Sequence, residues 1–61
     1  MTLAERMVWY RAKERISQTE LAQRCGLSLQ TIHSVETETQ TPSKVTLAKI
    51  ELVVGKESEE E

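Results

Sequence analysis

The segment SQTELAQRCGLSLQTIHSVE, residues 17–36, decides the fold of this 61-residue chain. Ser17, followed three residues later by Glu20, is typical of a capping box at the start of a helix. Gly26 stands directly after the apolar positions of that helix, where a glycine forms the left-handed turn that ends it. Ser28 can then begin a second helix. The apolar residues at helical spacing are Leu21, Ala22, Cys25, Ile32 and Val35. Two capped helices joined by a short glycine-containing turn are the helix-turn-helix arrangement.

Two further residues meet the packing demands of that arrangement. The two helices must cross at a steep angle, so the small side chain of Ala22 suits the position where their backbones approach. Leu27, directly after the glycine, would point inward and fix the turn. Both residues therefore favour a helix-turn-helix over two unrelated helices.

The rest of the chain predicts one more helix on each side. Thr2 and Glu5 form another capping box, which predicts a first helix at about 2–14, followed by an inward-facing Ile16. Residues 37–42 are polar and end in a proline, so we expect a loop there. Ser43 can cap a fourth helix that ends at Gly55. The apolar residues at helical spacing in these two helices are Leu3, Met7, Tyr10, Val45, Leu47, Ile50 and Val54.

Length and composition limit the class of protein. A chain of 61 residues forms one domain with a small core, and it carries no phosphate loop, metal cluster or nucleophile–base set. We therefore expect a binding module that uses no cofactor and no metal and has no enzymatic activity. No apolar run is long enough for a bilayer, no signal-peptide core follows Met1, and Cys25 is the only cysteine, which together predict a cytoplasmic protein.

Charge divides the chain into a domain at residues 1–55 and an acidic tail at residues 56–61. The tail has one cation and four anions, whereas the domain has seven cations and six anions. The tail therefore has a net charge of −3 and the domain one of +1, so the acidity of the chain belongs to the tail, which we expect to be frayed.

The chain resembles the Cro and phage-repressor (Xre-like) family over roughly residues 3–55. The resemblance starts at Arg11 and at the Ser17–Gln18 and Glu20–Leu21–Ala22 segments. It continues through Gly26, Leu27, Ser28, Ile32, Val35, Glu36, Pro42, Leu47, Ile50 and Gly55. It implies an all-α, four- to five-helix, lambda-repressor-like DNA-binding domain.

The resemblance also implies roles for individual residues. The second helix of the motif would be the recognition helix, with Gln30 reading adenine through its amide and His33 at the edge of the surface. Gln18 resembles the family glutamine that touches a phosphate and supports the recognition helix. Arg11 and Glu36 resemble the family's structural ion pair. The DNA-binding residues implied in this way are Gln18, Ser28, Leu29, Gln30, Thr31, His33, Ser34 and Thr39.

Three features depart from the family pattern. Residues 25–43 contain no lysine or arginine, although Thr39 stands where the family often has a cation. Phosphate contacts supply most nonspecific affinity, so this departure predicts weak binding with a shallow salt dependence. Glu38 replaces the usual glycine after the recognition helix, so we expect a left-handed residue there, which costs glutamate roughly 1 kcal/mol relative to glycine. Acidic residues replace the apolar fifth helix.

Val8 and Trp9 are expected to point partly outward from the first helix, which marks them as a candidate interface. We therefore predict a transcriptional regulator that binds double-stranded DNA as a homodimer. The alternative is a protein-interaction module, such as an antitoxin or accessory factor, that keeps the fold and binds a protein partner through Trp9. The lack of cations at residues 25–43 favours this alternative.

Overall fold

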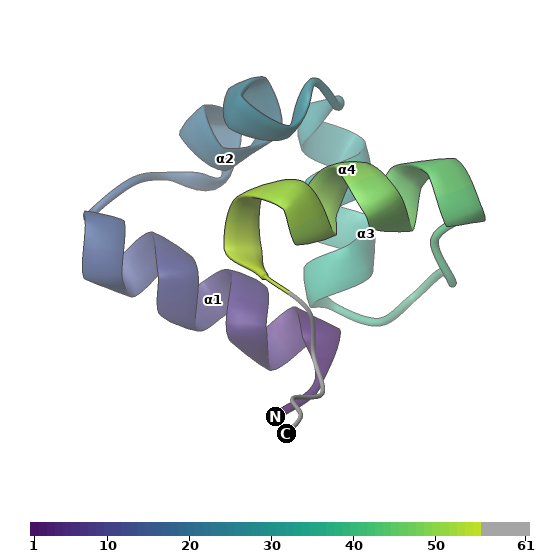
Figure 1. The fold of residues 1–61 in the computed structure, drawn as a ribbon, viewed down its shortest axis with the longest axis horizontal. Helices are drawn as coiled ribbons and strands as arrows, with labels where there is room; N and C mark the ends of the chain where they lie inside the picture. The colour runs from purple at the N-terminus through teal and green to yellow at the C-terminus, as the bar shows by residue number, and fades with distance from the viewer. Residues whose placement is uncertain (56–61) are drawn as a thin grey trace.

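The structure is a computed structural model that describes residues 1–55, and within them it contains four helices and no strand. They are α1 (Leu3–Glu14), α2 (Gln18–Cys25), α3 (Leu29–Glu36) and α4 (Lys44–Val54), arranged around a common centre (Figure 1). The all-α prediction is confirmed. The acidic tail at residues 56–61, with its expected fraying, lies outside the described residues.

A hydroxyl side chain begins every helix. Thr2, Ser17, Ser28 and Ser43 each accept a hydrogen bond from the backbone N–H three residues later, at 3.1 to 3.2 Å. At Thr2 the capping box is complete, because its N–H donates to Glu5 at 2.8 Å. At Ser17 the capping box is incomplete. The Ser17 side chain accepts from the N–H of Glu20, but the Glu20 side chain accepts from Arg24 Nε at 3.4 Å instead of from the Ser17 backbone.

The two helices before α3 end in left-handed turns. Gly26 has a φ of 71°, and the N–H of Leu27 returns to the carbonyl of Ala22 at 2.9 Å. Arg15 ends α1 in the same conformation, with a φ of 58°. The glycine was predicted to do this, whereas nothing in the sequence marks the arginine.

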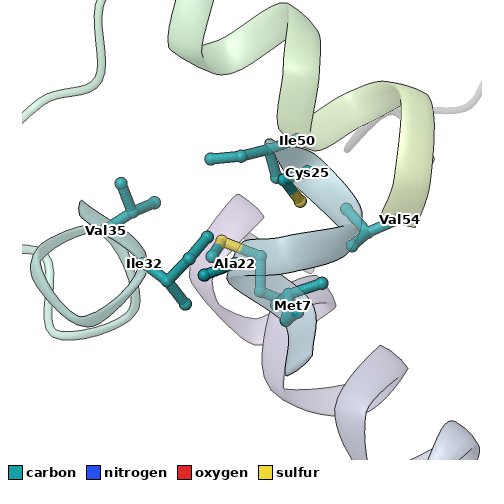
Figure 2. Packing of buried hydrophobic residues seen from close by; sticks show 8 residues of the cluster. Met7, Ala22, Cys25, Ile32, Val35, Ile50 and Val54 are labelled. Atoms are coloured by element: carbon teal, nitrogen blue, oxygen red, sulfur yellow. The ribbon is translucent and has the colours of Figure 1, made fainter. Parts of the chain in front are cut away.

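The core lies where α3 and α4 meet α1 and α2. α3 packs against α1 and α2, and α4 packs against the same two helices from another side. Figure 2 shows Ile32 and Val35 extending from α3 toward this centre. Burial raises the pKa of the Cys25 thiol, which therefore acts as a small apolar side chain. The buried cluster consists of Met7, Leu21, Ala22, Cys25, Ile32, Val35, Ile50 and Val54.

α4 buries less of its apolar surface than its sequence suggests. Ile50 and Val54 are buried and Leu47 is half-buried, but Val45 is 67% exposed. Leu52 is the most exposed large apolar residue, at 86%. Only one side of α4 therefore faces the other helices.

Across residues 1–55, none of the helices combines the length and the apolar character that crossing a bilayer requires. The same residues bring together no group of three or more His, Cys, Asp or Glu side chains that could hold a metal ion.

Candidate nucleic-acid interface

The first turn of α3 presents an exposed edge to solvent. Leu29 is 47% exposed, and Ser28 and Gln30 are also exposed, while Thr31 is half-buried. The hydroxyls of Ser28 and Thr31 lie 2.8 Å apart and bond to each other. Within residues 1–55 the Gln30 side chain makes no such local hydrogen bond, so its amide is the most available donor and acceptor on this edge.

The second turn of α3 continues the same surface with one residue turned partly inward. His33 is exposed, whereas Ser34 is half-buried. The backbone carbonyl of Ser34 accepts from the N–H of Thr39 at 3.0 Å and from its hydroxyl at 3.3 Å. Thr39 is exposed but is tied to the end of α3. Its hydroxyl can donate to a phosphate only if it gives up the 3.3 Å hydrogen bond to the Ser34 carbonyl.

At the opposite end of α3, a polar cluster joins three helices. Arg11 of α1 donates to Glu36 of α3 through Nε at 2.8 Å and through Nη2 at 2.9 Å. Gln18 of α2 donates to the same carboxylate at 2.9 Å. The Glu36 side chain is only 5% exposed and that of Arg11 23%. This bidentate pair fixes α3 relative to α1 and α2 in a partly buried site.

Gln18 therefore forms a hydrogen bond with Glu36 that could not be predicted from the sequence. One hydrogen of its Nε2 goes to Glu36, which leaves the other hydrogen and the amide oxygen for a further partner. Glu36 lies eighteen positions away in sequence, so only the tertiary fold brings the two together. The geometry gives Gln18 a positioning role alongside the phosphate contact that the resemblance implies.

The arginine and lysine closest in sequence to α3 are Arg24 and Lys44. Arg24 donates through Nη1 to the Tyr10 hydroxyl at 3.1 Å and to Glu14 at 3.3 Å, and through Nε to Glu20. The hydrogen bond to Tyr10 contributes most to raising the pKa of Arg24, so its charge persists but is balanced locally. Lys44 begins α4 and is exposed. It is the nearest lysine in sequence to the cation-free residues 25–43.

Glu38, just beyond α3, has a φ of 60°. The left-handed conformation expected at this position is confirmed. A non-glycine residue there crowds its Cβ against the neighbouring carbonyl, which costs roughly 1 kcal/mol. Glu38 is exposed, and its side chain lines a groove beside α1 rather than the interior.

Glu38→Gly is expected to raise the free energy of unfolding by up to about 1 kcal/mol, because glycine adopts a positive φ without this steric cost. Thermal unfolding at low protein concentration measures it. Thr37→Gly is the matched control: Thr37 has a φ of −88° and its hydroxyl donates to the His33 carbonyl at 2.8 Å. That control should lower stability. A loss of stability in both variants would contradict the assignment of strain to Glu38.

The outward side of α1 carries the candidate interface. Val8 is 46% exposed and Trp9 51% exposed, and both line the groove that Glu38 borders. Lys13 Nζ lies 4.9 Å from the centre of the Trp9 ring. The periodicity of α1 predicted that the Val8 and Trp9 side chains point outward. It could not predict the groove, because the groove forms only where α1 meets the segment after α3.

Comparison with known proteins identifies the family. The family model described as helix-turn-helix matches residues 8–60, which is most of the chain. Neither curated proteins nor solved structures gave a significant match. The match spans the capped helices α2 and α3 and the turn at Gly26, the elements that define this DNA-binding motif. The chain belongs to the helix-turn-helix family.

Proposed function

We propose that this protein is a transcriptional regulator that binds double-stranded DNA in a sequence-specific manner, with the first turns of α3 in the major groove. The observation that supports this most is the exposed edge of Ser28, Leu29 and Gln30, held out by the burial of Ile32 and Val35 on the opposite side of α3. An α-helix fits the major groove, and side chains at its N-terminal end reach base edges.

Individual residues take distinct parts in this proposal. Gln30 reads adenine, because its amide can donate to N7 and accept from N6 of that base. Gln18 and Thr39 contact the backbone, and the remaining contacts come from Ser28, Leu29, Thr31, His33 and Ser34. Arg11 and Glu36 touch no DNA but hold α3 in place.

The protein acts as a homodimer on a two-fold symmetric site in the cytoplasm. In this architecture two half-sites about 34 Å apart place both recognition helices on the same side of the duplex. Affinity should be modest. Because residues 25–43 contain no lysine or arginine, the affinity should also depend only weakly on salt concentration.

The test starts from a random duplex library, from which the preferred site is selected, and then measures affinity at two salt concentrations. Gln30→Ala is expected to relax preference at one base pair, by about 1–3 kcal/mol. Gln18→Ala is expected to weaken all sequences alike. Leu52→Ala, on the exposed side of α4, is the control and should change neither.

A second candidate function is a protein-interaction module that keeps this fold, such as an antitoxin or accessory factor. The absence of lysine and arginine from residues 25–43 favours it, as does the local balancing of Arg24 by Glu14 and Glu20. A chain that shows no binding to any duplex at low salt would support this function and contradict the first.

A further inference from the structure

An apolar groove of about 710 Å³ runs along the outward side of α1. Trp9, Val8 and Met1 are 51%, 46% and 63% exposed, so the groove contains much of the large apolar surface that this domain leaves in water. Ala4 and Ala12 also line it. Their small side chains allow another helix to approach closely, and an exposed tryptophan is the side chain that most often anchors a protein interface.

Charges around this surface are separated by sign. Glu5 and Glu38 line the groove near the start of α1. Lys13 and Arg15 are exposed near its end, and Lys13 lies against the Trp9 ring. The third carboxylate of the groove, Glu36, is already neutralised by Arg11. One end of the surface is therefore acidic and the other basic.

The spacing makes this surface complementary to itself. Glu5 and Lys13 are each four residues from Trp9, so each lies about 6 Å from it along the helix axis, in opposite directions. A two-fold axis at Trp9 would bring a second α1 alongside in the antiparallel direction. Glu5 of each copy would then lie level with Lys13 of the other, and the same pairing would occur twice.

We propose that the groove binds α1 of a second copy of this chain, antiparallel and centred on Trp9. A solely basic partner would leave Lys13 and Arg15 unpaired, and the acidic residues 56–61 have the same sign as Glu5 and Glu38. A second copy satisfies both ends of the surface. The proposal deepens the homodimer of the proposed function, but its test requires no DNA, so the two can fail separately.

The experiment exchanges the charges. Glu5→Lys and Lys13→Glu are made separately in the full chain, and self-association is measured by sedimentation velocity across a concentration series. In each variant alone, two pairs of like charges face each other, so self-association is expected to weaken at least about tenfold. In an equimolar mixture opposite charges meet again, and association should return to within about threefold of the wild-type value.

Trp9 provides a second readout, because it is the only tryptophan in the chain. Its emission should shift to shorter wavelength on association of the wild type and of the mixture, but not of either variant alone. Should Glu5→Lys fail to fold, Glu5→Gln replaces it, since glutamine also serves in a capping box, and a smaller weakening is expected. Leu52→Ala, on the exposed side of α4, is the control and should leave association unchanged.

Four results would overturn the proposal. The first is a wild-type chain that stays monomeric at every concentration, and the second is a mixture that associates no better than its components. The third is a dimer that depends on Leu52, which would place the interface on α4. The fourth is a monomeric protein whose Trp9 emission shifts when a basic leucine–lysine peptide is added, or shifts when residues 56–61 are removed. That would assign the groove to a foreign partner or to the tail.

Discussion

Glu36→Ala is expected to lower the free energy of unfolding by roughly 3 kcal/mol. The variant removes a carboxylate that is only 5% exposed, and it leaves Arg11 with its guanidinium partly buried and without its ion-pair partner. Gln18 loses its acceptor at the same time. For a domain of this length the total stability is about 3–9 kcal/mol, so the loss is a large part of it. Urea unfolding followed by circular dichroism measures the change.

Glu14→Ala is the matched control for Glu36→Ala. Glu14 also accepts from an arginine, Arg24, at 3.3 Å, but its side chain is 38% exposed. Ion pairs in such exposed positions contribute about 0–1 kcal/mol. Similar losses in the two variants would show that burial of the Arg11–Glu36 pair does not set its importance. The double variant Arg11→Ala, Glu36→Ala should lose less than the sum of the two single changes, because it leaves no charge stranded.

Ile32→Ala should cost about 2–5 kcal/mol, which is a large part of a total stability of about 3–9 kcal/mol. Ile32 is completely buried and packs from α3 into the cluster that includes Met7 and Ile50 (Figure 2). Truncation removes apolar surface and leaves a cavity that four short helices cannot fill without shifting. Thermal unfolding compared with the wild type checks this expectation.

The control for Ile32→Ala is the truncation of an equally apolar residue that contacts solvent. Leu52→Ala, at 86% exposure, should change stability by less than about 0.5 kcal/mol. An Ile32→Ala domain as stable as the Leu52→Ala domain would mean that the core is not organised around α3. The support behind the exposed Gln30 edge would then also be in doubt.

The start of each helix could be predicted from the sequence because its cause is local. Thr2, Ser17, Ser28 and Ser43 each act on an N–H only three residues away, and the turn at Gly26 needs only the absence of a Cβ. Interactions over so few residues can be recognised in the amino-acid sequence itself. The expected left-handed backbone at Glu38 came instead from comparison with a family pattern that has glycine there.

Features made by contacts between helices could not be predicted in the same way. Gln18 meets Glu36 only after α2 and α3 have packed. Arg24 of α2 donates to Tyr10 and Glu14 of α1, and only the packing of the two helices brings these residues together. Arg15 adopts a left-handed conformation without being glycine, and the N–H of the following Ile16 bonds to the Arg11 carbonyl at 3.0 Å. Neither these contacts between helices nor the conformation of Arg15 follows from the spacing of residues in the sequence.

The hydroxyl caps at the four helix starts also bear on how fast the protein folds. Each cap closes a loop of three residues, so an unfolded chain can form it without bringing distant segments together. Helical domains dominated by such near-neighbour contacts cross their folding barrier in microseconds to milliseconds. We expect this chain to fold in that range, with the encounter of α3 and α1 through Arg11 and Glu36 among the later events.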